Sequence, residues 1–174
     1  TPRLSVTDDF KDGTYTLHFT QSTPPNSDQA DKAPQVIPIA VGLLSQTGTE
    51  IQQTVILEMT EDQQSFAFDG LSEKPVPSIL RDFSAPVILQ RDQTNAERAF
   101  LMAHDTDPFN KWDAGRALAR DVLIKMVTQD AAPDAAYLDG ISAIMRDDAL
   151  DPAFRALSLS LPSKDDMAQA LHDA

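Results

Sequence analysis

Hydrophobic and polar residues alternate through the first half of the chain, which is the pattern of strands with one buried face. Residues 4–7 and 15–19 show this alternation on either side of Asp12-Gly13, a dipeptide that favours a tight hairpin turn. About seven short segments at turn spacing are typical of an immunoglobulin-like β-sandwich. The expected strands are 4–7, 15–19, 36–44, 51–59, 65–68, 79–83 and 87–91.

Turn-forming residues separate these segments. The stretch 22–34 is rich in Pro, Ser, Asn and Asp, so we expect a surface loop there. Pro38 has no backbone N–H and is therefore expected at a sheet edge or at the start of its strand. Gln46-Thr47-Gly48 and Asp69-Gly70 are expected to reverse the chain between strands.

From Thr94 onward the apolar spacing changes to that of amphipathic helices. Leu118, Val122 and Met126 recur every four residues within a long helix expected over 108–129. The other apolar stripes are Phe100, Leu101 and His104; Leu138, Ile141 and Met145; and Phe154, Leu157 and Leu161.

Capping residues mark the starts of these helices. They are Thr94 with Glu97, Asp107-Pro108, Asp151-Pro152, and Ser163 with Asp166.

We therefore predict a mainly β and then α fold in two domains. Residues 1–92 form the sandwich, and 93–174 form the start of an α-superhelical repeat domain, because short helices with one apolar face are typical of stacked repeats. The chain starts at Thr1 without a leader and stops inside a predicted helix, so we expect a piece of a longer protein. Apolar faces containing Phe154, Leu157 and Met167 predict that the isolated piece can self-associate.

Composition narrows the classes of function. The chain has 174 residues and no cysteine, which excludes disulfides, thiolate metal sites and a cysteine nucleophile. This composition suits a reducing compartment, so we expect a cytoplasmic location. The formal net charge of −13 disfavours nucleic acid and anionic membrane surfaces as partners.

The three histidines do not form a metal-binding motif. His18, His104 and His172 lie far apart, whereas a zinc peptidase needs two histidines one helical turn apart with a glutamate between them. His104 is expected at a helix C-terminus, where it interacts with the helix dipole. Asp105 and Asp107 could open a calcium loop, but the glycine and terminal glutamate of such a loop do not follow.

Acid pairs occur at Asp8-Asp9, Asp147-Asp148 and Asp165-Asp166. Adjacent acids rarely lie on opposite sides of one sugar bond, as glycosidase chemistry requires. Ser158 and Ser160 lie outside any Gly-x-Ser-x-Gly motif, so nothing activates them.

An aromatic pair, Phe109 and Trp112, could stack on a sugar or base, but its spacing at the head of a helix favours a packing role. The sequence thus assigns no catalytic, cofactor-binding or metal-binding residue to this chain.

Three longer stretches go beyond general patterns. Residues 66–70 read Phe-Ala-Phe-Asp-Gly, residues 74–87 read Lys-Pro-Val-Pro-Ser-Ile-Leu-Arg-Asp-Phe-Ser-Ala-Pro-Val, and residues 100–114 contain Phe-Leu-Met-Ala-His and Trp-Asp-Ala. Together they resemble the middle of the bacterial aminopeptidase N family of zinc-dependent exopeptidases. The resemblance covers essentially the whole chain but only a modest part of the full-length enzyme.

The resemblance implies a small β-sandwich that joins an upstream catalytic domain to a helical domain enclosing the active site. In that family the His-Glu-x-x-His zinc site and the Gly-x-Met-Glu-Asn loop lie upstream, and neither motif occurs here. The expected function is therefore a non-catalytic linker within an aminopeptidase, with zinc bound outside this chain. Its expected partners are the other domains of the same protein. The alternative is a free-standing immunoglobulin-like module that binds a protein or a glycan.

Overall fold

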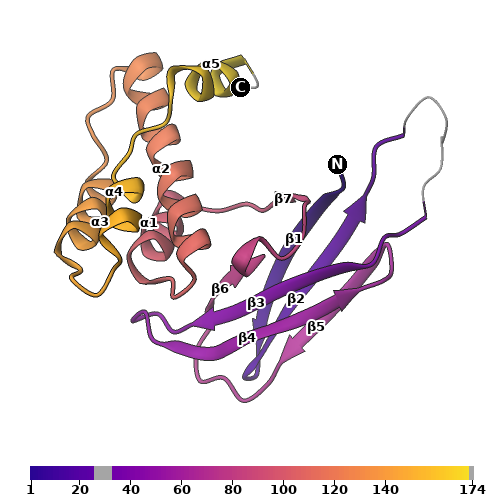
Figure 1. Cartoon of the computed structure of the whole chain (residues 1–174). Helices are drawn as coiled ribbons and strands as arrows, with labels where there is room; N and C mark the ends of the chain where they lie inside the picture. Colours follow the sequence, from indigo (N-terminus) through magenta and orange to yellow (C-terminus); the bar gives the residue numbers. More distant parts are fainter. Residues whose placement is uncertain (26–32, 173–174) are drawn as a thin grey trace. The chain divides into compact units, whose positions relative to one another are not determined.

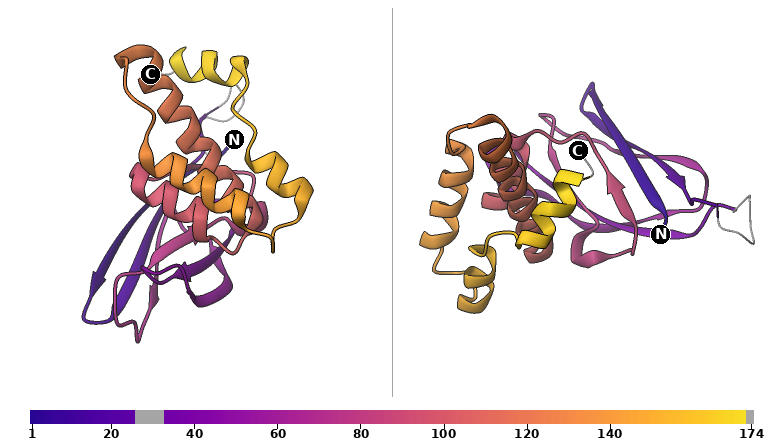
Figure 2. Two further views of the ribbon diagram at one scale, coloured as in Figure 1. Left: turned by 90° about the vertical axis from the view of Figure 1, so that its left-hand side faces the viewer. Right: turned by 90° about the horizontal axis from the view of Figure 1, so that it is seen from above.

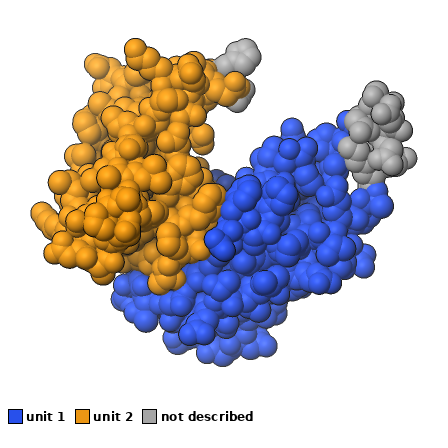
Figure 3. Space-filling view, viewed as in Figure 1, with its two compact units in different colours: residues 1–92 blue, residues 93–174 orange. Residues whose placement is uncertain are grey.

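The computed structural model describes residues 1–25 and 33–172. It divides into two compact units, residues 1–92 and residues 93–174 (Figure 3). We call the first the sandwich and the second the helical unit. Each is described by itself.

The sandwich contains two sheets, as the alternating pattern predicts (Figure 1). One sheet has the strand order β5-β2-β1-β7 and the other has the order β4-β3-β6. The strands are β1 (Arg3–Lys11), β2 (Thr14–Ser22), β3 (Ile37–Leu44), β4 (Glu50–Met59), β5 (Gln63–Phe68), β6 (Val76–Ile79) and β7 (Ile88–Gln90).

The β1–β2 hairpin turns where the sequence predicts. Lys11 pairs with Thr14, and the two residues between them have positive φ angles, 52° at Asp12 and 81° at Gly13. Asp and Gly tolerate this conformation better than most residues, and it matches the twist of a tight hairpin. The hairpin fixes the register of β1 and β2 along their whole length.

The core of the sandwich lies between the two sheets. Tyr15, Leu17 and Phe19 from β2 are at most 1% exposed, as their alternation predicts. The buried cluster contains Leu4, Val6, Tyr15, Leu17, Phe19, Ile37, Ile39, Val41, Leu43, Leu57, Met59, Ile79, Leu80 and Ala85.

One expected strand, at 79–83, is wrong. The strand β6 lies earlier and ends at Ile79, and Arg81–Phe83 forms a short 3₁₀ turn. Leu80, Asp82 and Phe83 have positive φ angles of 61°, 53° and 51°, which are incompatible with a strand. Left-handed backbone costs a non-glycine residue about 1–2 kcal/mol, so local sequence preference gives no warning of it.

Two further expectations concern the ends of strands. Pro38 is the second residue of β3 and pairs with Glu58 of β4. On its other side β3 pairs with β6 only from Val41 to Leu44, so the missing N–H at Pro38 breaks no ladder there. Most of the loop expected at 22–34 lies outside the described residues, whereas its first residue, Ser22, ends β2.

The helical unit contains five helices within its described residues (Figures 1 and 2). In this unit α1 packs against both α2 and α3. The helices are α1 (Asn95–His104), α2 (Pro108–Gln129), α3 (Ala135–Arg146), α4 (Pro152–Ser158) and α5 (Lys164–His172).

The predicted caps are present at the starts of α1, α2, α4 and α5. Thr94 accepts from the Glu97 amide, Asp107 from the Asn110 amide, and Asp151 from the amides of Ala153 and Phe154. Ser163 and Asp166 form a reciprocal capping box, in which each side chain accepts from the backbone N–H of the other. Asp134 caps α3 through its side chain alone, which accepts from the amides of Ala136 and Tyr137.

The buried cluster of the helical unit consists of Met102, Leu118, Val122 and Ile144, with Met126 packed against it. The stripe predicted on α2 is therefore confirmed. The stripe predicted on α3 is wrong in part, because Leu138 and Met145 are 51% and 58% exposed. The residues of α3 that pack inward are Tyr137, Gly140, Ile141 and Ile144.

Met102 explains this choice of face on α3. Its side chain is fully buried between Gly115 of α2 and Gly140 of α3. A Cβ atom at Gly140 would lie 2.8 Å from Met102 Sδ, and one at Gly115 would lie 3.2 Å from Met102 Cγ. The two glycines therefore let three helices approach around one methionine, which turns Leu138 and Met145 outward.

The stripe predicted on α4 is only partly buried. Leu157 and Leu161 are 52% and 58% exposed, and Leu161 lies beyond the end of the helix. Three apolar residues were expected to be exposed and to favour self-association. Of these, Phe154 and Met167 are half-buried and Leu157 is exposed.

Candidate functional site

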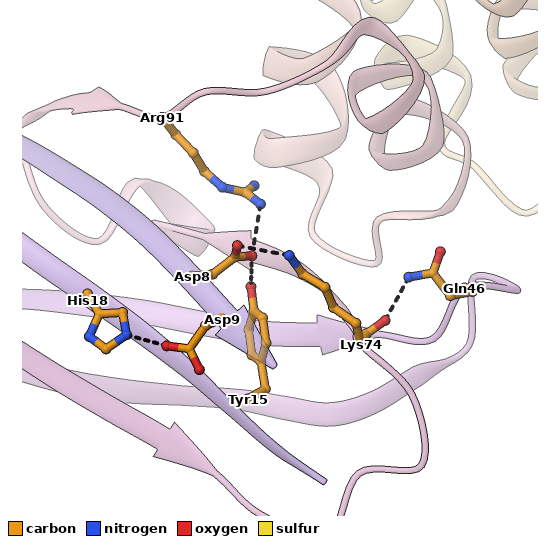
Figure 4. Close-up of polar contacts among 7 residues, drawn as sticks. All are labelled: Asp8, Asp9, Tyr15, His18, Gln46, Lys74 and Arg91. Carbon is orange, nitrogen blue, oxygen red and sulfur yellow. Dashed lines mark hydrogen bonds and ion pairs between the residues drawn. The ribbon is translucent and has the colours of Figure 1, made fainter. Parts of the chain in front are cut away.

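A polar cluster of the sandwich centres on Asp8 of β1 (Figure 4). Tyr15 donates its hydroxyl proton to Asp8 Oδ2 at 2.5 Å, and Lys74 Nζ donates to Asp8 Oδ1 at 2.9 Å. Arg91 Nη2 lies 3.8 Å from Oδ2. Gln46 Nε2 donates to the carbonyl oxygen of Lys74 at 2.7 Å and so holds the backbone that carries the lysine. We call these five residues the Asp8 cluster.

Opposing influences act on the pKa of Asp8. Burial alone would raise it, because a charged carboxylate loses hydration. The hydrogen bonds from Tyr15 and Lys74, together with the positive charges of Lys74 and Arg91, outweigh burial and lower the pKa below its ordinary value of 3.8. Asp8 is therefore a carboxylate, and each of its two oxygens accepts a hydrogen bond. Such a group stabilises structure and is a poor general acid at neutral pH.

Asp9 faces the other side of the same sheet, because successive side chains of a strand alternate. Its Oδ2 lies 2.6 Å from His18 Nε2, and His18 Nδ1 lies 2.7 Å from Ser65 Oγ. The strands β1, β2 and β5 thus place a carboxylate, an imidazole and a hydroxyl in one row. Asp8 and Asp9 therefore bond to different partners on opposite faces of the sheet.

The row Asp9–His18–Ser65 contains the residue types of a serine hydrolase. It lies on the solvent face of the sheet, where the His18 and Asp9 side chains are 44% and 58% exposed. Water competes for every hydrogen bond at such exposure, whereas hydrolase catalysis relies on a water-excluded site with fixed donors for the oxyanion. The geometry fits a cross-strand polar contact.

Three residues of the other acid pairs, Asp147, Asp148 and Asp166, have local structural roles. Asp147 accepts from the Ala149 amide at the end of α3, and Asp148 pairs with Arg155. Asp166 belongs to the capping box of α5 and also pairs with Arg116 of α2. Hydrogen bonds from Ser163 and the charges of nearby arginines lower its pKa.

The first turn of α2 contains a buried lysine, Lys111, that no sequence motif indicates. Lys111 is 5% exposed and donates to the carbonyl oxygen of Ala103 at 2.7 Å, which satisfies an acceptor near the end of α1. Burial lowers the pKa of Lys111, although Asp147 and Asp105 act in the opposite direction. Asp105 accepts from the Asp107 amide at 2.9 Å, so these acids shape the turn before α2.

His104 is the last residue of α1, as expected, and its ring centre lies 4.8 Å from that of Phe100. Partial burial and the nearby charge of Lys111 lower its pKa, so the neutral form is favoured. The placement therefore agrees with the sequence, but the lowered pKa weakens the expected interaction with the helix dipole, which needs a positive charge. His172 lies in α5, and its side chain is outside the described residues.

The remaining candidates are occupied locally. Ser158 and Ser160 donate to the carbonyl oxygens of Phe154 and Ala156, four residues earlier. Trp112 is half-buried, and the Arg116 guanidinium lies 5.4 Å from the centre of its ring. Its ring centre is 5.9 Å from that of Phe109.

Among the described residues, no three or more His, Asp or Glu side chains gather as metal ligands. Zinc favours four-coordinate sites with three or four protein ligands. The best-placed histidine, His18, has one carboxylate beside it. The donor set of the described residues therefore does not fit a zinc site. In the same part of the chain, no helix is long and apolar enough to cross a membrane.

Comparison with known families accounts for the whole two-unit arrangement. Residues 1–92 match a family described as a domain of unknown function (DUF3458) with an Ig-like fold. Residues 95–174 match a second family, DUF3458_C, described as ARM repeats.

Individual relatives agree with these matches. The chain is 41% identical to part of aminopeptidase N of Caulobacter vibrioides, a match that covers 74% of this chain and 15% of the relative. It is 34% identical to part of aminopeptidase N of Escherichia coli, which covers 97% of this chain and 21% of that protein. The chain thus spans about a fifth or less of the curated relatives it matches.

A solved structure has the same fold. The crystal structure of Legionella pneumophila aminopeptidase A in complex with aspartic acid superposes with a TM-score of 0.83 at 26% identity. The match covers 97% of this chain and 19% of that one. Both units of this chain therefore have counterparts inside a longer aminopeptidase chain.

Proposed function

Because this chain belongs to the DUF3458 family of Ig-like domains, continued by DUF3458_C ARM repeats as in aminopeptidase N, we propose that it is a non-catalytic linker within an aminopeptidase. The parent protein removes N-terminal residues from peptides and binds its zinc outside this chain. One observation carries the proposal: 97% of the chain aligns with a single stretch of an aminopeptidase that is about five times longer.

The contribution of this chain to the parent is geometric. A well-packed sandwich is a rigid spacer, because close-packed cores resist deformation. The spacer sets the distance between the catalytic domain and the helical domain that encloses the active site. The contacts of Asp8, Asp9 and Lys111 support this role, since each of these side chains has a local structural partner.

The partners of this chain are the other domains of the parent. Exposed apolar side chains on the helical unit support this inference, because a repeat of the ARM type buries one face against its neighbours. Leu138, Met145, Leu157 and Leu161 are each more than half exposed. In the isolated chain the same residues would favour self-association.

The direct test is aminopeptidase activity of the purified chain with added zinc against a panel of aminoacyl anilides. We expect no turnover and no stoichiometric zinc. Turnover that survives repurification and follows the folded monomer would contradict the proposal. Ser65→Ala is the matched variant: residual hydrolysis that this substitution removes would identify the Asp9–His18–Ser65 row as its source.

A second test uses the full-length parent. Deleting this segment is expected to abolish peptidase activity, through loss of the fold or of the enclosure. A soluble deletion variant with full activity would refute the linker role.

A further inference from the structure

The turn that follows β6 is the most strained backbone in the described part of the sandwich. Leu80, Asp82 and Phe83 all have φ between 51° and 61°, and none of them is glycine. Such conformations persist only where surrounding contacts impose them. Something in the fold must therefore hold residues 80–83 in place.

Arg81, the remaining residue of this turn, has the contacts that could do so. It is 3% exposed. Its Nε donates to Ser78 Oγ at 3.0 Å, and its Nη1 donates to Glu50 Oε1 at 2.6 Å and to Thr54 Oγ1 at 3.0 Å. The guanidinium thereby joins the turn to Ser78 of β6 and to Glu50 and Thr54 of β4.

Gly42 provides the space for this guanidinium. It lies in β3, the central strand of its sheet, where glycine normally weakens a strand. A Cβ atom at this position would overlap the guanidinium carbon of Arg81 and lie 2.5 Å from Nη2. The backbone of Gly42 has no positive φ, so the glycine is required by the approach of Arg81 and not by backbone conformation.

We propose that Arg81 is a positioning residue: its guanidinium, lying on Gly42 and bonded to Glu50, Thr54 and Ser78, holds the 80–83 turn in its left-handed conformation. The turn in turn places Ser84, whose Oγ accepts from the Ala40 amide at 3.0 Å, and buries Ala85. Arg81 thus determines the path by which the chain crosses from the sheet of β6 to the sheet of β7. This inference concerns the sandwich alone and does not depend on the proposed linker role.

The test is amide hydrogen exchange on the whole chain, followed by NMR. The Ser84 amide donates to the Arg81 carbonyl oxygen and the Ala40 amide to Ser84 Oγ, so both report on the turn. In Arg81→Ala we expect both amides to exchange at least about tenfold faster, with the amides of β1 and β2 unchanged. Unchanged exchange at Ser84, or an equal increase throughout β1 and β2, would overturn the proposal.

Further variants separate positioning from general packing. Arg81→Lys keeps the charge but loses the planar fork, so we expect it to behave like Arg81→Ala. Gly42→Ala should also accelerate exchange of the Ser84 amide, but should add little in the Arg81→Ala background, because the clash requires the guanidinium. Equal effects in both backgrounds would contradict the contact.

A rescue experiment tests the strain directly. Glycine adopts positive φ without steric cost, so Asp82→Gly should slow exchange of the Ser84 amide again in the Arg81→Ala background. Asp82→Ala, which gives no such relief, is the matched control. No difference between the two double variants would count against a role of Arg81 in holding a strained backbone.

Discussion

The two units of this chain are stabilised in different ways. The sandwich has a large buried cluster to which both sheets contribute, and its polar contacts join distant positions such as Asp8 and Lys74. The helical unit has a smaller buried cluster around Met102, and α4 buries no residue fully. Its helix starts are instead fixed by local caps such as Ser163 with Asp166.

This difference has a physical origin. A strand forms no hydrogen bonds within itself, so it needs partners that are remote in the sequence. A helix satisfies its own backbone and needs help only at its ends and along one face. We therefore expect substitutions in the sandwich core to cost more free energy of unfolding than changes at helix caps.

The largest effect is expected for Phe19→Ala. Phe19 is 1% exposed, and its ring packs edge-on against Phe66 at 6.0 Å. Truncation should lower the free energy of unfolding of the sandwich by about 3–5 kcal/mol. Urea unfolding followed by NMR of β1 and β2 measures this.

Ile56→Ala is the matched control, because Ile56 is 66% exposed. It should change stability by less than about 0.5 kcal/mol. Trp112, the single tryptophan, reports separately on the helical unit. If Phe19→Ala lowered the stability of the helical unit, followed by Trp112 fluorescence, as much as that of the sandwich, the two cores would not be independent.

A smaller effect is expected for Asp8→Asn. Removing a charged acceptor from the Asp8 cluster should cost about 1.5–3 kcal/mol at neutral pH. The pKa of Asp8 is lowered in the folded state, so its contribution is complete above pH 3.8 and is lost as pH falls through the lower folded value. Urea unfolding should be measured from pH 7 down to acid pH. The difference in free energy of unfolding between Asp8→Asn and the unsubstituted chain should shrink as the pH falls.

Asp9→Asn is the control on the same strand. It removes an exposed pair with His18, and such pairs contribute about 0–1 kcal/mol. If Asp9→Asn and Asp8→Asn lowered the free energy of unfolding equally at neutral pH, burial of the carboxylate would not be what distinguishes the two residues.

The smallest effect is expected for Ser163→Ala, which removes one side of the capping box of α5. Loss of an N-cap costs about 1 kcal/mol. Unfolding of the helical unit followed by Trp112 fluorescence measures it. Ser160→Ala serves as control, because the Ser160 hydroxyl only donates to a carbonyl oxygen four residues earlier. If both variants behave alike, the cap does not stabilise the unit.

Local chemistry made several elements predictable. Asp12-Gly13 specifies a tight turn, Pro108 and Pro152 specify helix starts, and Ser163 with Asp166 specifies a cap, because each acts within a few residues of chain. The change from strand to helix spacing, and the resemblance to aminopeptidase N, were visible for the same reason. Each depends on residue order alone.

The wrong predictions share a different cause. A turn occupies 80–83 in place of the expected strand because Arg81 contacts Glu50 and Gly42, which are remote in the sequence. The prediction of the buried face of α3 was wrong in part because Gly140 has no side chain and so adds nothing to an apolar pattern. In the folded chain, however, Met102 packs against Gly140.

Sequence by itself thus determined the order and type of most elements, the absence of zinc-peptidase and serine-hydrolase motifs, and the family. Only the tertiary structure decided that Asp8 and Asp9 serve opposite faces of a sheet, that Lys111 is buried, and that Arg81 lies on a glycine. The reason is physical: propensities, caps and turns act over a few residues. Burial, pairing of charges and close approach of backbones depend on neighbours that only the folded chain brings together.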